Sequence, residues 1–344
     1  MNIETRLQSI LNRSLNRHVP GIVVLIESGD GEFSWTGTAG AVSADQQYFI
    51  ASTTKLFTTA ILLRLHNERK ADLDTQIGAI LSREMIEGVH RCKGHECSQL
   101  ITIRQLLSHT SGLPDYFQDR CDGSTLQSQL IHGHDKAWDI HDVLTAVKRM
   151  KPKFLPNTPN RAYYSDTNFQ LLGLIATTIT GKPISDLYDD FIIRSLGLRS
   201  TYLYTDPTDH RPLPLNYKDA PLLIPKAMAS FGPDGGIVST SRDSIRFLKG
   251  FFGGEIFPEQ FFTEMKNWNR IFFPLQYGMG IARFKLPWFF SPFQRVPELI
   301  GHSGLSGAWA FHAPEKDLYV AGTVNQIANP GRPFHLICRL ISCF

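Results

Sequence analysis

Strand-like segments lie near both ends of the chain, and helical patterns fill the region between them. The segments GIVVLIES and GEFSWTGTAG predict a hairpin that turns at Gly29-Asp30-Gly31. Three segments near the carboxyl end also predict strands: YGMGIARF, ELIGHSGLSGAWAFHAP and DLYVAGTVNQ. Backbone groups of strands need partners, so this pattern predicts an α+β fold whose sheet is built from both termini, with a mostly helical region inserted between them.

The helical patterns are clearest in TIRQLLSHTSG, HDVLTAVKRM, NFQLLGLIATTITG and ISDLYDDFIIRSLGL. The N-terminus has apolar residues at helical spacing among arginines, which predicts an amphipathic helix, and RPFHLICRLISCF predicts a closing helix. With 344 residues the chain is long enough for a large core. We predict one domain over 1–344, with a sheet part at about 1–50 and 225–344 and a helical part at about 51–224.

Composition narrows the class of protein. A hydrophobic fraction of 42% and a charged fraction of 19% are typical of a soluble globular protein. The formal net charge of +3 is too small, and the basic residues too scattered, to predict a nucleic-acid partner. The 5 cysteines, the absence of a signal-peptide pattern and the lack of a long uninterrupted apolar segment lead us to expect a cytoplasmic protein with no integral membrane segment.

The stretch YFIASTTKLFTTAILLRL, which begins at Tyr48, places a serine and a lysine where a strand-like pattern gives way to a helical one. Ser52 and Lys55 are three residues apart, so both side chains point the same way from the first helical turn. Lysine is seldom buried without a partner or a task. The four-residue pattern alone favours a Ser/Thr cap and a lysine whose charged end reaches solvent, because so short a pattern often occurs by chance.

Three further stretches bear on that choice. In PNTPNRAYYSDTNFQLLG, Tyr164 and Asp166 alternate in an extended loop and can face one cavity, although Ser165 or Asp166 could instead cap a helix that begins near Asn168. In IGHSGLSGAWAF, the His302-Ser303-Gly304 segment can offer a backbone N–H to a ligand from a strand edge, or be an ordinary glycine bulge. In LLSHTSGLPDY, His109, Thr110 and Ser111 are better suited to hold a loop in place than to react.

These stretches occur together in a fixed order, and the sequence thereby resembles the serine β-lactamase and penicillin-binding protein superfamily. The similarity is to its class C-like branch, which includes D-alanyl-D-alanine carboxypeptidases, D-aminopeptidases and esterases. Ser52-Thr53-Thr54-Lys55 matches S-x-x-K, Tyr164-Ser165-Asp166 matches Y-x-N, and His302-Ser303-Gly304 matches the third motif. The resemblance extends from about Gly21 to Gln326 and implies a β-lactamase/transpeptidase-like fold with an antiparallel sheet flanked by helices.

The resemblance implies a serine hydrolase that acts through an acyl-enzyme. Ser52 would be the nucleophile, and Lys55 and Tyr164 would share the task of accepting its proton. A charged Lys55 would favour the phenolate of Tyr164, which would then be the base, whereas a Lys55 made neutral by burial could accept the proton itself. The backbone N–H groups of Ser52 and Leu305 would stabilise the oxyanion. The residues expected to contact substrate are Asp166, His302, Ser303, Gly304 and Leu305.

Two motif positions depart from the family pattern. Asp166 stands where Asn is usual, and its charge should stabilise the ammonium form of Lys55. His302 stands where Lys is usual, which would make a positive charge under a substrate carboxylate depend on pH. Both departures favour an esterase-like or peptidase-like enzyme over a true class C β-lactamase. The substrate is expected to be a small ester, amide or peptide, and neither the physiological substrate nor the oligomeric state follows from the sequence.

An α/β-hydrolase would need G-x-S-x-G, which neither Ser303 nor Ser306 satisfies. A protein that becomes acylated without turnover, such as a sensor or scaffold, fits the same motifs.

No cofactor and no metal is predicted, although HRCKGHEC offers four possible zinc ligands: His90, Cys92, His95 and Cys97. An aromatic run belongs to the core or a domain seam, or else lines an apolar acyl pocket or touches a membrane surface: Phe272, Phe273, Trp288, Phe289, Phe290 and Phe293.

Overall fold

The computed structural model describes residues 2–287 and 296–344. The strands of its main sheet are β1 (Gly21–Ser28), β2 (Ser34–Gly40), β10 (Asn269–Phe272), β11 (Leu275–Tyr277), β12 (Ala282–Phe284), β13 (Leu299–Ser303), β14 (Ala308–Ala313) and β15 (Leu318–Thr323). Shorter strands are β3 (Tyr48–Phe49), β4 (Arg91–Cys92), β5 (His95–Glu96), β6 (Tyr202–Leu203), β7 (Leu215–Tyr217), β8 (Ala220–Leu222) and β9 (Ile237–Ser239).

The α-helices are α1 (Ile3–Ser14), α2 (Thr54–Asn67), α3 (Arg83–Ile86), α4 (Ile103–Leu107), α5 (Leu126–Ile131), α6 (Ile140–Lys148), α7 (Asp166–Thr180), α8 (Ile184–Tyr188), α9 (Arg194–Leu196), α10 (Pro225–Met228), α11 (Ser241–Phe252), α12 (Phe261–Met265) and α13 (Arg332–Ile341). Single turns of 3-10 helix are η1 (Ala51–Thr53), η2 (Ile77–Ala79), η3 (Ser98–Leu100), η5 (Gly232–Asp234) and η7 (Pro314–Lys316), and η4 (Asp189–Ile193) is a π-helical turn.

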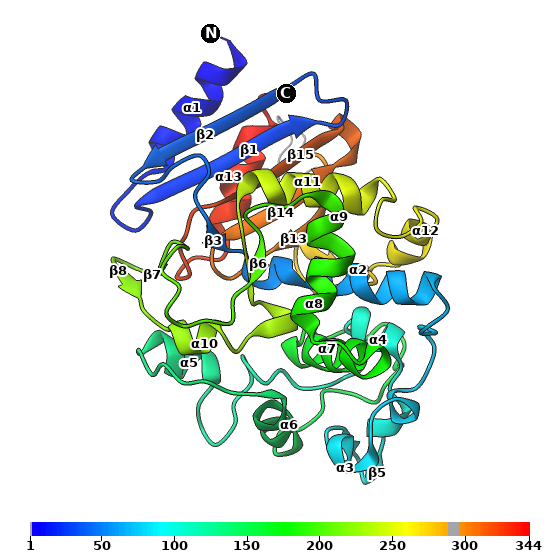
Figure 1. The fold of residues 1–344 in the computed structure, drawn as a ribbon. Helices are drawn as coiled ribbons and strands as arrows, with labels where there is room; N and C mark the ends of the chain where they lie inside the picture. Colours follow the sequence, from blue (N-terminus) through cyan, green and yellow to red (C-terminus); the bar gives the residue numbers. More distant parts are fainter. Residues whose placement is uncertain (1, 288–295) are drawn as a thin grey trace.

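The main sheet joins the two ends of the chain. Its strand order is β10-β11-β12-β13-β14-β15-β1-β2, and every neighbouring pair is antiparallel. The N-terminal hairpin enters this sheet through β1, which pairs with β15 from the C-terminal region. In Figure 1 the blue and orange strands lie side by side at one end of the molecule, and the green and cyan helical part lies at the other. The predicted fold class, with a sheet from both termini and an inserted helical region, is confirmed.

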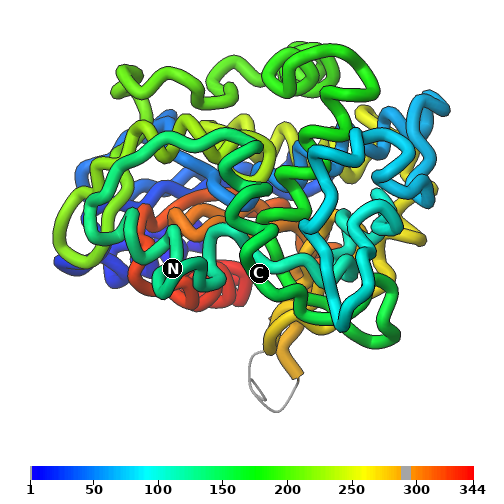
Figure 2. Tube along the Cα trace, turned by 90° about the horizontal axis from the view of Figure 1, so that it is seen from below, coloured from blue at the N-terminus to red at the C-terminus, as the bar shows by residue number. Residues whose placement is uncertain are grey.

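Helices cover both faces of the sheet. On one face, α1 and α13 pack together against an apolar cluster that includes Leu7, Trp309 and Ile337. On the other face, α11 packs on β1, β14 and β15. Figure 2 shows α13, in red, on the opposite side of the orange strands from the yellow-green segment that contains α11. Strand residues alternate between the two clusters, as the two-residue period of a strand requires.

The larger apolar cluster extends from the α11 face of the sheet into the helical part. At its centre lies α2, in which nearly every side chain from Thr54 to Leu65 is buried. A second small sheet, in the order β3-β9-β6, leads the chain into this helix. This small sheet was not predicted, because strands of two or three residues are too short to show a periodicity. It sets the direction in which the chain reaches Ser52.

Two predicted strands are each broken by glycine-containing turns. YGMGIARF holds the last residue of β11 and all of β12 rather than one strand, because Gly280 has a φ of +74° and its N–H donates to the Leu107 carbonyl at 2.9 Å. ELIGHSGLSGAWAFHAP contains β13 and β14, which are joined by a turn in which the Gly307 N–H donates to the Gly304 carbonyl at 3.0 Å. The glycines inside these two segments were the sequence signal for turns.

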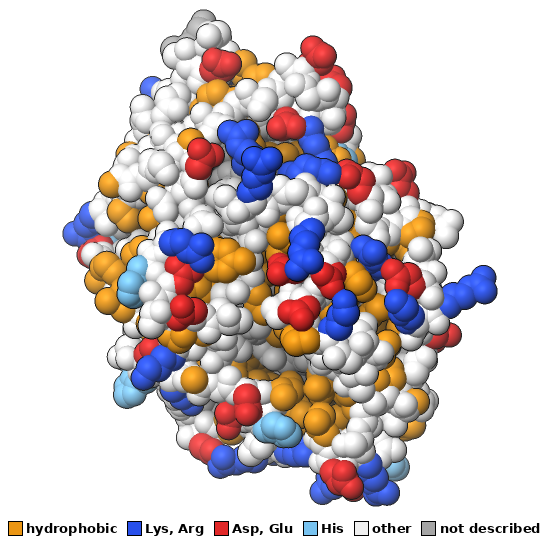
Figure 3. All heavy atoms as spheres, viewed as in Figure 1, with side chains coloured by type: hydrophobic (Ala, Val, Ile, Leu, Met, Phe, Trp, Pro, Cys, Tyr) orange, Lys and Arg blue, Asp and Glu red, His pale blue; other side chains and the backbone are white. Residues whose placement is uncertain are grey.

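The surface carries both signs of charge. On the face shown in Figure 3, acidic and basic side chains are interspersed, with apolar side chains between them. Phe272 and Phe273, from the predicted aromatic run, are 58% and 65% exposed, so neither belongs to the core, whereas Trp288, Phe289, Phe290 and Phe293 lie outside the described residues. Within residues 2–287 and 296–344, no helix has both the length and the apolar character needed to cross a bilayer.

Candidate active site

Ser52 lies at the turn between β3 and α2, inside η1. The residue before it, Ala51, has a φ of +46°, a left-handed conformation that costs a residue with a Cβ about 1–2 kcal/mol. Strain of this kind persists only where surrounding packing holds it. Here a Cβ added to Gly304 would lie 2.3 Å from the Ile50 carbonyl oxygen, so the end of β13 presses directly against the strained turn. The turn presents the Ser52 hydroxyl at the N-terminus of a buried helix.

Lys55 is fully buried one turn further along α2. Its Nζ donates to Ser52 Oγ at 3.3 Å and to the Asp234 carbonyl at 2.7 Å, and lies 2.6 Å from Asp166 Oδ1. Burial acts to lower the pKa of Lys55, but the negative charges of Asp166 and Asp234 outweigh it and raise the pKa above its ordinary value. Lys55 is therefore an ammonium in the resting site, as the aspartate at the Y-x-N position predicted, and the alternative of a lysine made neutral by burial is wrong.

Tyr164 lies in the loop before α7, and its hydroxyl forms a hydrogen bond with Ser52. Lys55 Nζ lies 5.3 Å from the centre of its ring. Burial and the charge of Asp166 raise the pKa of Tyr164 well above its ordinary value, although the contact with Ser52 acts in the opposite direction. The expected phenolate is thus wrong for the resting site, because burial and the charge of Asp166 both disfavour the ionised form. Tyr164 is a neutral phenol beside the nucleophile.

His109 and Ser111 hold the Tyr164 loop in place, as predicted. The Ser165 N–H and the Asn168 side-chain amide donate to Nδ1 of His109 at 3.1 and 2.8 Å, and Ser111 Oγ donates to Asn168 Oδ1 at 2.6 Å. Burial lowers the pKa of His109 well below its ordinary value, so its ring stays neutral and can accept these bonds. The loop is anchored by a neutral histidine.

The capping interpretation of the same loop is wrong. Helix α7 begins at Asp166 rather than near Asn168, and neither of the two candidate side chains caps it. Ser165 Oγ donates to the Pro114 carbonyl at 2.9 Å, and the Asp166 carboxylate faces Lys55. Asp166 is thus directed into the site by a partner that lies more than a hundred residues earlier in the chain.

His302 lies on β13, but it is not a titrating cation. Its Nδ1–H donates to the Ser303 carbonyl at 2.8 Å, and its Nε2 accepts from the Tyr277 hydroxyl at 3.2 Å. Burial and the charge of Lys55 lower the pKa of His302 to about 3. The expectation that His302 supplies a pH-dependent positive charge is therefore wrong. Tyr277 lines a pocket that also contains Ser52, and its hydroxyl fixes the ring of His302.

The turn after β13 supplies a second backbone N–H near Ser52. The Gly304 N–H donates to the Ala308 carbonyl at 2.8 Å, and Ser306 Oγ donates to the Phe49 carbonyl at 2.6 Å, which ties the turn to the strand that leads to Ser52. Leu305 lies between them and lines the same pockets as Ser52. Within the described part of the chain, neither its N–H nor that of Ser52 has a hydrogen-bond partner. Two free donors at this place can stabilise an oxyanion.

Sequence reasoning missed a buried carboxyl group, Asp234. Its Oδ2 accepts from the Tyr116 hydroxyl at 2.8 Å and from Gln170 Nε2 at 2.9 Å, while its carbonyl holds Lys55. Burial and the charge of Asp166 raise the pKa of Asp234 to about 7. The signal was the acidic residue between glycines in GPDGG, which has no helical or strand periodicity to explain it.

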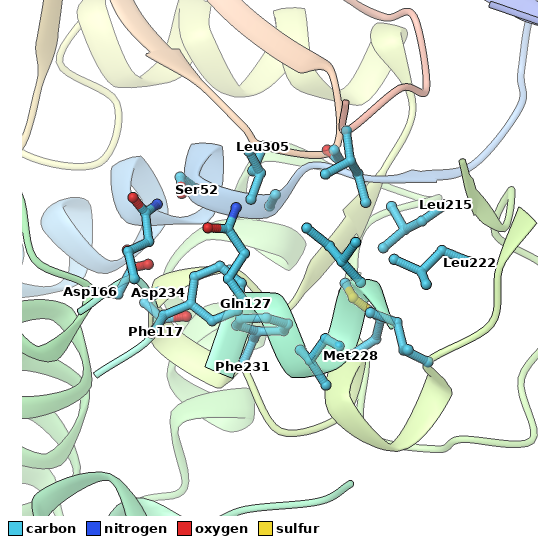
Figure 4. A pocket seen from close by; sticks show the side chains of 18 residues that line it. Ser52, Phe117, Gln127, Asp166, Leu215, Leu222, Met228, Phe231, Asp234 and Leu305 are labelled. Carbon is cyan, nitrogen blue, oxygen red and sulfur yellow. The ribbon is translucent and has the colours of Figure 1, made fainter. Parts of the chain in front are cut away.

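Two pockets meet at Ser52. The first, which we call the α5–α10 pocket, is lined by Ser52, Leu130, Leu215, Leu222, Met228 and Leu305, among others. The second, the β11–α13 pocket, is lined by Ser52, Tyr164, Leu275, Tyr277, His302 and Phe334, among others. Gln118 and Gln127, which the sequence did not single out, line both. Figure 4 shows Ser52, Asp166 and Asp234 toward one end of the α5–α10 pocket and Leu215 and Leu222 toward the other.

The possible zinc ligands do not converge. His90 is buried, and its Nε2 lies 2.9 Å from the Phe154 carbonyl, whereas His95 is exposed in the β4–β5 hairpin. Across the described residues, no group of three or more His, Cys, Asp or Glu side chains is arranged to hold a metal ion. The closely spaced His and Cys residues form a short hairpin instead.

Solved structures with this fold cover the whole chain. A D-stereospecific amidohydrolase from Streptomyces sp. is 28% identical, with a TM-score of 0.79 over 96% of this chain and 97% of that chain. A D-amino acid amidase from Ochrobactrum anthropi SV3 has a TM-score of 0.80 over 100% of this chain and 98% of that chain, and at 23% identity it supports the fold alone.

Curated relatives match shorter segments. An unguisins hydrolase from Aspergillus campestris is 29% identical over 207 residues, which is 56% of this chain and 35% of that protein. Penicillin-binding protein 4 from Amycolatopsis lactamdurans is 24% identical over 70% of this chain and 62% of that protein. The chain thus spans less than two thirds of the length of these relatives. A family model described as Beta-lactamase matches residues 3–335, and the chain belongs to that family.

Proposed function

We propose that this protein is a serine hydrolase that cleaves a carboxylic ester or amide through an acyl-enzyme on Ser52. The observation that carries the proposal is the convergence of Ser52, Lys55 and Tyr164 on one point between two pockets. A serine hydroxyl becomes nucleophilic only when a base can take its proton, and Ser52 contacts both candidate bases. The unpartnered N–H groups of Ser52 and Leu305 support the same chemistry.

The bonds and protons balance with the groups present. Ser52 Oγ attacks the carbonyl carbon while its proton passes to the Lys55–Tyr164 pair, and the oxyanion accepts from the Ser52 and Leu305 N–H groups. The tetrahedral intermediate then expels the alcohol or amine, which takes a proton from Tyr164. Water cleaves the acyl-enzyme by the same route in reverse, and Ser52 regains its proton. The pair must start with one proton fewer than in the resting form, because both pKa values are raised.

The relatives favour turnover over simple acylation. The matched proteins include a hydrolase and an amidohydrolase, so a sensor or scaffold that is acylated without release is not favoured. At the third-motif position His302 supplies no positive charge, since it is neutral and both its ring nitrogens are engaged. This arrangement supports an esterase or amidase over an enzyme that grips a substrate carboxylate, as a dedicated β-lactamase does.

Intact-protein mass after incubation with p-nitrophenyl acetate, a fluorescent penicillin and a D-Ala-D-Ala peptide tests the proposal. We expect an acyl adduct and sustained turnover with at least one of them in the wild type, and neither in Ser52→Ala. Ser195→Ala, at an exposed serine on α9, is the matched control and should behave as the wild type does. An adduct that persists in Ser52→Ala, or the absence of adduct and turnover with all three compounds, would contradict the proposal.

A further inference from the structure

The two pockets that meet at Ser52 differ in which catalytic group they contact. Tyr164 lines the β11–α13 pocket and does not line the α5–α10 pocket. The group that protonates the departing alcohol or amine must face it, since proton transfer requires hydrogen-bond reach. The leaving group of a bound substrate therefore lies on the β11–α13 side of Ser52. The acyl group, on the other side of the scissile bond, then points into the α5–α10 pocket.

The lining of the α5–α10 pocket determines what kind of acyl group it can hold. Away from Ser52 its walls come from separate elements: Leu130 of α5, Leu215 of β7, Leu222 of β8, Met228 of α10 and Phe231. Of these, Leu215, Leu222 and Met228 lie away from Asp166 and Asp234 (Figure 4). An apolar lining favours apolar ligand groups, because each methylene that enters it is removed from water.

The charges around the same pocket act against a charged acyl group. None of the described residues that line it is a lysine, an arginine or a histidine, and its ionisable side chains are those of Asp166 and Asp234. Lys55 cannot serve as a partner for a substrate carboxylate, because it is already held by Asp166 and the Asp234 carbonyl. A carboxylate on the acyl chain would thus be desolvated without a cation and beside acidic groups. Gln118 and Gln127, at the junction of the pockets, offer neutral polar contacts only.

We propose that the α5–α10 pocket is the acyl-binding site and that it selects substrates with an uncharged, apolar acyl group of several carbons, aliphatic or aromatic. This inference rests on the proposed hydrolase function and adds the substrate class to it. The leaving alcohol or amine occupies the β11–α13 pocket. Specificity for the acyl group is thus set by the β7–β8 hairpin and by α5 and α10, none of which carries a catalytic residue.

Three p-nitrophenyl esters with one leaving group isolate the acyl side: acetate, hexanoate and the adipate monoester. The adipate monoester differs from hexanoate only in a carboxylate in place of the terminal methyl group. We expect kcat/KM to rise roughly tenfold or more from acetate to hexanoate, and to fall by about tenfold or more from hexanoate to the adipate monoester. The leaving group is constant, so neither change can come from the β11–α13 pocket.

Matched substitutions locate the effect. Leu222 and Leu275 are both partly buried strand residues, and each lines only one of the two pockets that contain Ser52. Leu222→Asn should reduce the preference for hexanoate over acetate by several-fold, whereas Leu275→Asn should leave the ratio unchanged. Leu222→Trp, which narrows the same pocket without adding charge, should lower kcat/KM for hexanoate and spare acetate. The ratio of two esters measured on one preparation does not depend on how much of a variant is folded.

The outcomes separate this inference from the proposed function. Turnover of acetate that requires Ser52 but shows no gain with hexanoate, or no loss with the adipate monoester, would overturn the acyl pocket and leave the hydrolase standing. A change of the hexanoate/acetate ratio in Leu275→Asn but not in the Leu222 variants would assign the acyl group to the other pocket and also overturn it. Absence of any turnover that depends on Ser52 would overturn both.

Discussion

At the residue scale, the distinctive feature is a lysine that is fully buried and fully charged. Lys55 contacts the nucleophile, yet the carboxylate 2.6 Å away keeps its proton in place. The aspartate at position 166 makes this difference, since the amide of an asparagine would supply no charge. The pKa of Tyr164 is also raised, because the charge of Asp166 adds to burial in disfavouring its phenolate. One carboxylate thus contributes to the raised pKa of both candidate bases.

The pH dependence of acylation follows from these shifts. Acylation needs the Lys55–Tyr164 pair to lose a proton, and both pKa values are raised, so we expect the rate to climb through the alkaline range. Asp166→Asn removes one charge that raises both pKa values, so the ascending limb should move to lower pH by roughly one unit or more. Single-turnover release of p-nitrophenol from p-nitrophenyl acetate between neutral and alkaline pH measures this.

Asp186→Asn provides the matched control for that measurement. Asp186 is an exposed aspartate on α8, and its loss should leave the profile unchanged. An ascending limb that stays at the same pH in Asp166→Asn, or that moves to higher pH, would show that Asp166 does not set the proton affinity of the pair.

At the scale of elements, the site depends on the contact between the end of β13 and the turn before α2. The strained residue Ala51 is held from one side by Gly304, and Ser306 ties the β13–β14 turn to the Phe49 carbonyl. The same contact sets the separation between the two N–H groups of the expected oxyanion hole. Catalytic donors need a fixed position, because an oxyanion is stabilised only within hydrogen-bond distance.

Gly304→Ala tests this contact. An alanine Cβ would lie 2.3 Å from the Ile50 carbonyl oxygen and 2.9 Å from Ala51 Cβ, so the turn must move away from Ser52. We expect kcat to fall by about a hundredfold, as when one oxyanion donor is lost, with a smaller change in KM. Steady-state kinetics with p-nitrophenyl acetate, alongside thermal unfolding, measure both effects.

A second variant grades the same prediction. Ser306→Ala removes the hydrogen bond to the Phe49 carbonyl without adding bulk, so its kcat should fall less than that of Gly304→Ala. If Gly304→Ala kept the wild-type kcat, the contact would not position the donors.

At the scale of the whole molecule, the sheet separates two apolar clusters with different tasks. The cluster on the α11 face continues into the helical part and surrounds α2, which carries Lys55 and begins two residues after Ser52. The cluster on the opposite face is formed with α1 and α13. Stability and chemistry are thereby partly separated: α13 also lines the β11–α13 pocket, whereas no residue of α1 lines either pocket that contains Ser52.

Leu7→Ala tests that separation. Leu7 of α1 is fully buried, so its truncation should lower the free energy of unfolding by about 2–5 kcal/mol. Activity per folded molecule should stay at the wild-type value. Chemical denaturation together with active-site titration measures the two quantities, and Arg6→Ala, at an exposed position on the same helix, should change the stability by less than about 0.5 kcal/mol. A loss of kcat/KM per titrated site in Leu7→Ala would mean that the two clusters are coupled.

Much of the fold could be predicted from periodicity, and the three motifs could be located by their order. The positions of Ser52, Lys55 and Tyr164 were predicted. Of the charge states, the ammonium of Lys55 was expected from Asp166, whereas the neutral forms of Tyr164 and His302 were not. Sequence spacing shows which groups can share a face, whereas a pKa depends on burial and on charges that arrive from distant segments. Asp234 was missed for that reason, since it meets Lys55 across 179 positions of the chain.

The sequence by itself determined the class of fold, because alternation and helical spacing mark which faces must be buried, and it determined which residue types are available for chemistry. The tertiary structure decided what those residues are at rest: Lys55 an ammonium, Tyr164 a phenol and His302 a neutral ring. It also decided that the pocket beyond Ser52 is apolar and has no cation among its described lining residues. Both decisions rest on segments far apart in the chain, and only folding sets the distances and the burial on which charge and affinity depend.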